Sequence, residues 1–206
     1  MPGKNLVRQF SADAYYHVYN RGVDKKTIFV DEDDYKFFSS LFARSAGPKP
    51  GIDRYGRECK WLGDEIEVLA FCWMPNHYHL LLFQKDNPKA ISELMQGVGT
   101  AYTMYYNKKY KRKGTLLESS YKASLITDDD YFAHITRYIH LNPKEYKSWR
   151  YSSYPDYANN TVIHDWVHPD YILGNFADRK EYSTFVADYQ DNKKSLDIIK
   201  HELANQ

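Results

Sequence analysis

The chain has 206 residues, about the length of a single domain or of one domain with an appendage. Its 28 basic and 27 acidic side chains give a net charge of +1, which argues against a strongly basic nucleic-acid coat protein but allows a local basic patch. A hydrophobic content of 43% excludes a disordered chain, and only two cysteines exclude a disulfide scaffold and a four-cysteine zinc site. No apolar run is long enough to cross a bilayer, and residues 1–16 lack the apolar core of a secretion signal, so we expect a cytoplasmic protein.

The first half of the chain predicts three strands and one helix. β-forming residues over 15–21, followed by Gly22, predict a first strand. An acidic run at 31–34 before helical apolar spacing over 35–46 predicts a helix that begins at the carboxylates. Residues 47–63, rich in glycine and proline, predict a flexible connection. The apolar runs 65–73 and 78–83, joined through Met74-Pro75-Asn76, predict a hairpin.

The following segments predict a long helix over 88–110, a strand over 123–127, and a helix that begins at 128–130 and continues to Asn142, before Pro143. The order β-α-β-β-α-β, followed by another helix, is typical of an α+β, ferredoxin-like fold, an antiparallel sheet with helices on one face. Beyond Trp149 the apolar periodicity weakens. We therefore expect residues 1–149 to form the domain, and residues 150–206, with a charged helix near 193–203, to form a mainly helical or irregular extension packed on it.

His77-Tyr78-His79 lies where the predicted hairpin enters its second strand. Because strand residues two apart point to the same face, both imidazoles can bind one metal ion while Tyr78 faces away. The pattern equally fits two exposed histidines around a packed tyrosine, and an imidazole pair does not distinguish zinc, iron and copper. Both interpretations stay open on these residues.

The helix before Pro143 carries a second polar group. At a spacing of four residues, His134, Tyr138 and Asn142 form a row beside an apolar stripe that would face the sheet. We expect His134 to orient the Tyr138 phenol. The alternative is a half-buried packing tyrosine and an asparagine that only caps the helix.

A basic cluster follows the long helix, with five cations between residues 108 and 113 around Tyr110. Such a cluster suits contacts to phosphate groups, and it also suits a solvated helix end, where cations are favourable. The candidate phosphate-contacting and DNA-binding residues are Arg21, Lys108, Lys109, Lys111, Arg112, Lys113 and Lys122.

Four segments occur in one order along the chain: YHVYNRG at 16–22, WMPNHYHLLL at 73–82, YKA at 121–123 and RYIHLNP at 137–143. As a set, spanning residues 14–149, they resemble the single-tyrosine HUH transposases, and among them the REP-associated tyrosine transposases. The combination is much more specific than either histidine or tyrosine motif alone. The resemblance implies the same βαββαβ fold that the hydrophobic pattern predicts.

The resemblance also implies roles for individual residues. His77 and His79 would bind Mg²⁺ or Mn²⁺, with Asn142 as third ligand at a position where other branches carry glutamine, and Tyr138 would be the nucleophile. The implied activity is that of a DNA transposase and single-strand endonuclease, which cleaves and rejoins hairpin-forming DNA through a 5′-phosphotyrosine intermediate without a nucleotide cofactor. Relatives act on palindromic hairpins, at the nucleoid, as monomers or as homodimers that exchange the tyrosine helix.

Three alternatives remain beside this interpretation. The chain could be a domesticated nuclease that processes chromosomal hairpins, or a non-catalytic protein that binds DNA hairpins. It could also be a metal-dependent hydrolase that uses water, which predicts turnover that survives Tyr138→Phe.

Overall fold

The computed structural model describes residues 10–52, 56–58, 60–127, 129–159 and 163–188. The predicted helix near 193–203 and the first residue of the predicted cap, Asp128, lie outside these ranges.

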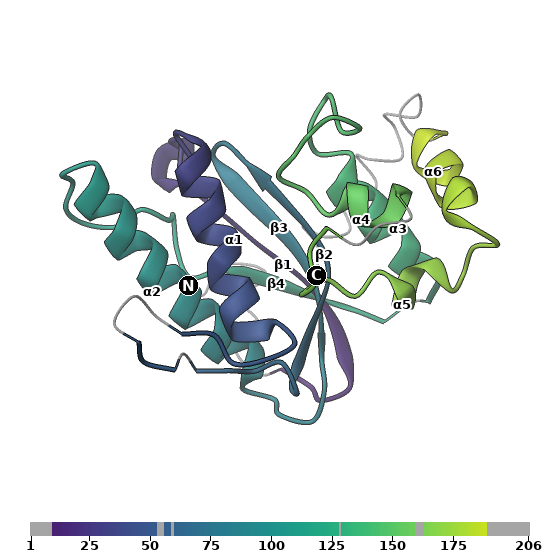
Figure 1. Ribbon diagram of the computed structural model, residues 1–206, viewed down its shortest axis with the longest axis horizontal. Coiled ribbons are helices and arrows are strands. Elements are labelled where there is room, and N and C mark those ends of the chain that lie inside the picture. The colour runs from purple at the N-terminus through teal and green to yellow at the C-terminus, as the bar shows by residue number, and fades with distance from the viewer. Residues whose placement is uncertain (1–9, 53–55, 59, 128, 160–162, 189–206) are drawn as a thin grey trace.

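A four-stranded antiparallel sheet with the order β2-β3-β1-β4 forms the centre of the molecule (Figure 1). Its strands are β1 (Ala14–Arg21), β2 (Ile66–Met74), β3 (His77–Gln84) and β4 (Lys122–Ile126). Helix α1 (Glu32–Ala46) connects β1 to β2, α2 (Ala90–Lys109) connects β3 to β4, and the short helix η1 (Val23–Lys25) follows β1. This connectivity confirms the predicted ferredoxin-like α+β fold.

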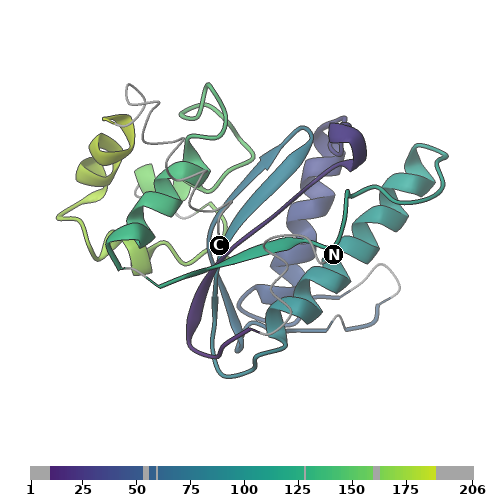
Figure 2. The same cartoon turned by 180° about the vertical axis from the view of Figure 1, so that it is seen from behind.

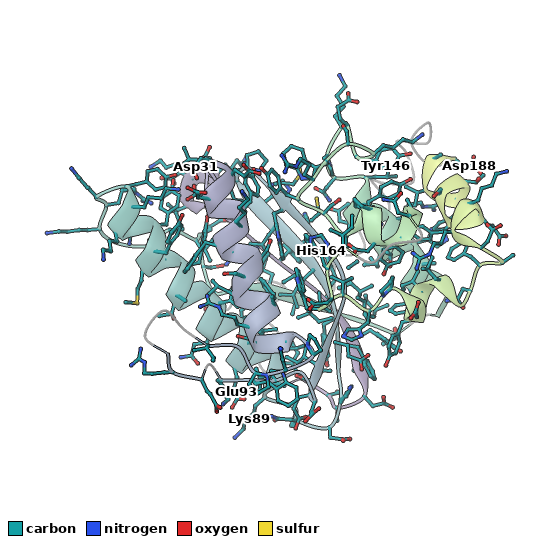
Figure 3. All side chains as sticks on the ribbon, in the orientation of Figure 1. Asp31, Lys89, Glu93, Tyr146, His164 and Asp188 are labelled. Atoms are coloured by element: carbon teal, nitrogen blue, oxygen red, sulfur yellow. The ribbon has the colours of Figure 1, made fainter. Side chains whose placement is uncertain are left out.

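Helices cover both faces of the sheet (Figures 1 and 2). The prediction of helices on one face holds for α1 and α2, whereas α3 (Asp129–His140) packs on the opposite face through the buried side chains of Ile135 and Ile139. The extension adds α4 (Tyr154–Ala158), α5 (Asp170–Leu173) and α6 (Arg179–Ala187) on the α3 side. Side chains fill the space between the layers on each face (Figure 3).

The extension covers β2, which is an edge strand. The backbone N–H of Trp73 donates to Tyr151 O at 2.8 Å, and that of Ser153 donates to Phe71 O at 3.0 Å. Behind this contact, the buried His140 is hydrogen bonded to Ser153 Oγ at 2.8 Å and to the Tyr182 hydroxyl at 2.7 Å. The extension therefore satisfies backbone groups that an uncovered edge would expose to other chains.

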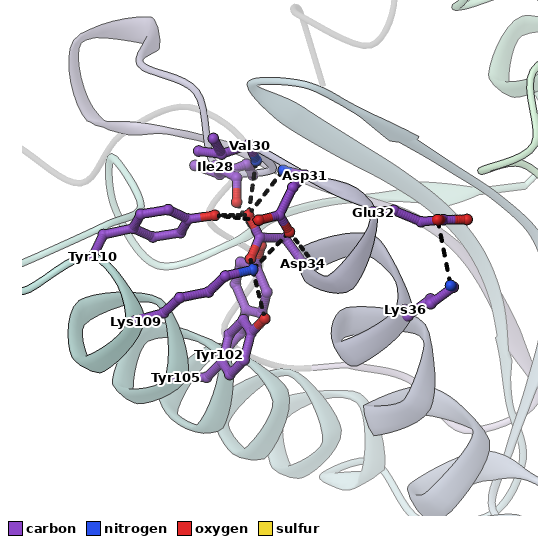
Figure 4. A network of polar contacts seen from close by, with 10 residues as sticks. All are labelled: Ile28, Val30, Asp31, Glu32, Asp34, Lys36, Tyr102, Tyr105, Lys109 and Tyr110. Atoms are coloured by element: carbon purple, nitrogen blue, oxygen red, sulfur yellow. Dashed lines mark hydrogen bonds and ion pairs between the residues drawn. The ribbon is translucent and has the colours of Figure 1, made fainter.

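A polar network joins the start of α1 to the end of α2 (Figure 4). The Asp31 carboxylate caps α1 by accepting the N–H of Asp34 at 3.2 Å. Lys109 Nζ donates to Asp31 at 2.6 Å and to the fully buried Asp34 at 2.8 Å, and the Tyr110 hydroxyl donates to Asp34 at 2.7 Å. The contacts of Lys109 therefore stabilise the packing of two helices.

Replacing Lys109 tests this structural role. We expect Lys109→Met to lower the free energy of unfolding by about 2 kcal/mol, because it removes charge-assisted hydrogen bonds to a buried carboxylate. Lys108→Met is the matched control, since Lys108 is exposed on the same turn and should change stability by less than about 0.5 kcal/mol. Urea denaturation measures both values, and equal stabilities of the two variants would contradict the role.

The buried His140 makes the stability depend on pH. Burial lowers its pKa from 6.5 to about 3, so acid protonates this group in the unfolded chain before the folded one. Its contribution is therefore present above pH 6.5 and is lost as the pH falls toward 3, by about 1.4 kcal/mol between pH 7.5 and 5.5. In denaturant titrations at these two pH values, His140→Gln should show a correspondingly smaller pH dependence than wild type. An unchanged dependence would refute the assignment.

Candidate active site

Strand pairing brings the predicted histidines to the end of the sheet at which β1 ends and β3 begins. In the β1–β3 register, Arg21 lies opposite His77 and Tyr19 lies opposite His79. The His77 and His79 ring centroids are 5.1 Å apart. Tyr78 is buried in the core on the α1 and α2 side, which confirms that it faces away from them.

The end of α3 differs from the prediction. The helix ends at His140 and not at Asn142, because the N–H of Asn142 turns to the Ile139 carbonyl three residues back, at 3.4 Å. The Asn142 side chain folds back over this last turn, where its Nδ2 donates to the Tyr138 carbonyl at 3.2 Å. This contact leaves the amide oxygen of Asn142 directed toward β3.

The imidazole of His77 lies between two amide oxygens. Its Nδ1 is 2.7 Å from Asn76 Oδ1, and its Nε2 is 3.1 Å from Asn142 Oδ1. Both amide orientations are supported independently, because Asn76 Nδ2 donates to the Lys25 carbonyl at 3.1 Å and Asn142 Nδ2 donates to a backbone carbonyl. A neutral imidazole carries one N–H and satisfies only one of the two oxygens.

Protonation is an unfavourable way to satisfy the second oxygen. Burial, together with the nearby Arg21, lowers the pKa of His77, although the contact with Asn142 acts in the opposite direction. Burial, with smaller contributions from His17 and His77, lowers the pKa of His79 well below its ordinary value. Both imidazoles are therefore neutral at pH 7, with one lone pair each for a cation.

The spacing of two of these donors fits an octahedral divalent ion. Adjacent ligands of an octahedral ion with bonds of about 2.1 Å lie about 3.0 Å apart, close to the separation of His77 Nε2 and Asn142 Oδ1. Within the part of the chain that the structure describes, no cluster of three or more His, Cys, Asp or Glu side chains could hold a metal ion. The candidate site therefore depends on Asn142 beside His77 and His79.

Tyr138 lies next to these histidines within the same chain. Its ring centroid is 5.5 Å from that of His79 and 5.9 Å from that of His17. Burial raises the pKa of the Tyr138 phenol, and a hydrogen bond with the Asn142 side chain offsets part of this effect. A second tyrosine, Tyr19, also lies near the pair, with its ring centroid 5.9 Å from that of His79.

His134 contacts Arg137 on its own helix and Phe185 on α6. Its Nδ1 accepts a hydrogen bond from Arg137 at 2.5 Å, and its ring lies edge-on to Phe185 at 5.5 Å. A role for His134 in orienting Tyr138 stays a hypothesis.

A pocket of about 300 Å³ opens beside the histidines. The Arg21 guanidinium reaches it and is paired with Glu118, and Lys122 Nζ lies 6.0 Å from the Tyr19 ring centroid. The pocket is lined by Tyr19, Asn20, Arg21, Lys25, Asn76, His77, His79, Glu118 and Lys122. Two predicted cations, Arg21 and Lys122, thus lie near the histidine pair.

The other predicted cations lie at the end of α2. Lys108, Lys111 and Lys113 are exposed, and Arg112 lies over the Tyr106 ring at 5.5 Å. The loop that follows them returns to the pocket, where the N–H of Glu118 donates to the Arg21 carbonyl at 2.9 Å. Lys109 is held by the carboxylates of the α1–α2 network.

Several residues of the site were not predicted: His17, Tyr19, Lys25, Asn76 and Glu118. The alternation along β1 is the signal for two of them, since His17, Tyr19 and Arg21 point to one face of a strand. Alternation alone does not show which residues lie opposite these side chains. Only the β1–β3 register places them beside His79.

The fold and the site together define a ferredoxin-like domain that carries a His-x-His pair beside a helix-borne tyrosine. Residues 59–142, which include His77, His79, Tyr138 and Asn142, match the family model described as Transposase IS200 like. Over these residues the chain is therefore similar to the IS200-like transposases.

One solved structure supports the fold. The chain is similar to a REP-associated tyrosine transposase bound to a REP hairpin, with a TM-score of 0.55, 13% identity, and coverage of 79% of this chain and 90% of that one. A transposase structure from Deinococcus radiodurans R1 has 20% identity and a TM-score of 0.37, and covers 68% of this chain and 95% of that one. No curated protein has a matching sequence. Across the described ranges, no helix is both long and apolar enough to span a membrane.

Proposed function

We propose that this chain is a DNA transposase that cleaves and rejoins hairpin-forming single-stranded DNA through a covalent link to Tyr138. The observation that carries the proposal is the approach of His77 Nε2 to Asn142 Oδ1, 3.1 Å apart, with His79 and Tyr138 beside them. The family match over residues 59–142 supports it, as does a structural neighbour that is bound to a REP hairpin.

His77, His79 and Asn142 would hold Mg²⁺ or Mn²⁺. The oxygen of Asn142 suits such hard ions better than a third imidazole would. When bound, the ion supplies charge neutralisation and orientation of the scissile phosphate.

Tyr138 supplies the nucleophile. Its phenol oxygen forms a bond to phosphorus while the bond from phosphorus to the 3′ oxygen breaks. The phenol proton is lost to solvent, the departing 3′ oxygen takes up a proton, and the products are a 5′-phosphotyrosine and a free 3′ hydroxyl. A second 3′ hydroxyl reverses these steps and joins strands, so that no nucleotide cofactor is needed.

The cations nearest to the pocket contact the DNA backbone. Arg21 and Lys122 lie on adjacent strands, and Lys25 adds a third positive charge. The remaining proposed DNA-binding residues, Lys108, Lys109, Lys111, Arg112 and Lys113, form a second basic region at the end of α2. For Lys109, DNA contact requires the ammonium group to leave Asp31 and Asp34.

A single copy of the chain assembles the whole group, because α3 brings Tyr138 to the histidines of its own β3. This arrangement favours a monomer, although the resemblance also allows a homodimer with exchanged helices.

The proposal predicts a covalent adduct. Wild-type protein incubated with Mn²⁺ and a labelled single-stranded DNA hairpin should give a protein–DNA band that survives denaturation in gel electrophoresis. Tyr138→Phe should abolish the band, because it removes the only atom that attacks phosphorus, and His77→Ala should abolish it through loss of metal binding.

Tyr19→Phe is the matched control, because Tyr19 also lies beside His79 and lines the pocket. This variant should retain the adduct. Loss of the adduct in Tyr19→Phe, with retention in Tyr138→Phe, would assign the nucleophile to Tyr19. Cleavage that persists without any adduct in Tyr138→Phe would favour the hydrolase, and binding without cleavage by wild type would favour the non-catalytic alternative.

The rate of adduct formation should rise with pH. In the metal-free protein burial raises the pKa of the Tyr138 phenol. If the phenol is still protonated at neutral pH when the ion is bound, its reactive phenolate increases roughly tenfold per pH unit. Single-turnover rates between pH 6.5 and 8.5 should therefore increase with a slope close to one on a logarithmic scale. A flat profile would show that loss of the phenol proton does not limit the reaction.

A further inference from the structure

His17 is a fully buried histidine on β1 whose only described polar contact is to the histidine pair. It is 1% exposed and lies on the same sheet face as Tyr19 and Arg21. Its ring packs between that of Tyr19, with centroids 5.0 Å apart, and that of Tyr138, at 5.9 Å. The site described above gives it no role as a ligand.

The contact between His17 and His79 is an in-plane hydrogen bond. His17 Nε2 and His79 Nδ1 are 2.9 Å apart, although the two residues are separated by 62 positions in sequence. The ring planes differ by 10° and the centroids are 5.1 Å apart, as expected for two imidazoles joined edge to edge. Rotation of the His79 ring about its side-chain axis would break this bond.

His77 is held in the same way. Its Nδ1 is engaged by Asn76 Oδ1 at 2.7 Å, and Asn76 is itself oriented by its bond to the Lys25 carbonyl. In both imidazoles Nδ1 is therefore engaged by a neighbouring side chain, and Nε2 is the nitrogen left for the site. Hydrogen bonds of this kind orient metal-binding histidines and select their tautomer.

A second observation separates this role from simple packing. His17 Nδ1 is buried and, among the described residues, has no hydrogen-bond partner. A leucine would fill a similar volume without leaving a buried polar atom unpaired, which costs stability. An imidazole differs from leucine here in its Nε2 atom, and the described hydrogen bond of this atom is to His79.

We propose that His17 is a positioning residue that holds the His79 ring with Nε2 directed to the metal site. The inference rests on the proposed function, in which His79 is a ligand. In the metal-bound state His17 Nε2 accepts the N–H of His79 Nδ1, so that the lone pair of His79 is at Nε2. The role requires an acceptor at this position and not an imidazole as such.

Mn²⁺ binding measured by electron paramagnetic resonance tests the role without any DNA. His17→Leu should weaken binding by about 10–100-fold, because it removes the acceptor at similar volume. His17→Gln should restore binding to within about threefold of wild type, since its side-chain oxygen can accept from Nδ1. His140→Leu is the matched control, because it replaces an equally buried histidine that is bonded to Ser153 and Tyr182. Circular dichroism confirms that each variant is folded.

The outcomes separate this inference from the proposed function. If His79→Ala abolishes Mn²⁺ binding while His17→Leu binds like wild type, the role of His17 is refuted and the metal site stands. Equal weakening in His17→Leu and His17→Gln, or in His17→Leu and His140→Leu, also refutes it. If His79→Ala binds Mn²⁺ as tightly as wild type, both the proposed metal site and the role of His17 are wrong.

Discussion

The site depends on one constraint: the imidazole of His77 lies between two amide oxygens and can donate a hydrogen to only one of them. Both oxygens are held in place, Asn76 by the Lys25 carbonyl and Asn142 by the carbonyl of Tyr138. Since burial disfavours the imidazolium, a bound metal cation would satisfy both the nitrogen lone pair and the second oxygen, as the proposed function requires. The position of Tyr138 depends on the same contacts, because the Asn142 side chain is hydrogen bonded to the helical turn that carries Tyr138.

The same site is supported from both faces of the sheet. On one face, the α1–α2 network and the apolar core hold α1 and α2 against the sheet. Because these helices connect β1 to β2 and β3 to β4, their packing stabilises the strand order that places β1 beside β3. On the other, the extension covers the edge strand β2 and shares a core with α3. The strand pair that carries the histidines is therefore buried between two layers, which limits its movement relative to Tyr138.

Much of the fold could be predicted from local sequence. The acidic cap before Glu32, the hairpin around Pro75 and the apolar stripe of α3 each reflect contacts between residues near in sequence. Alternation along a strand likewise places His77 and His79 on one face, whereas their role as metal ligands follows only from the resemblance and stays a prediction. The contact of His17 with His79 could not be predicted, because it joins residues 62 positions apart and exists only in one register of β1 against β3. The partners of Lys109 likewise depend on how α1 packs against α2.

The most direct test of the metal site is an anomalous-scattering map from crystals of this protein grown with Mn²⁺. The account predicts one Mn²⁺ peak within bonding distance of His77 Nε2, His79 and Asn142 Oδ1, with the Tyr138 hydroxyl facing it. A map at saturating Mn²⁺ with no peak at these atoms, or with peaks only elsewhere, would contradict the account.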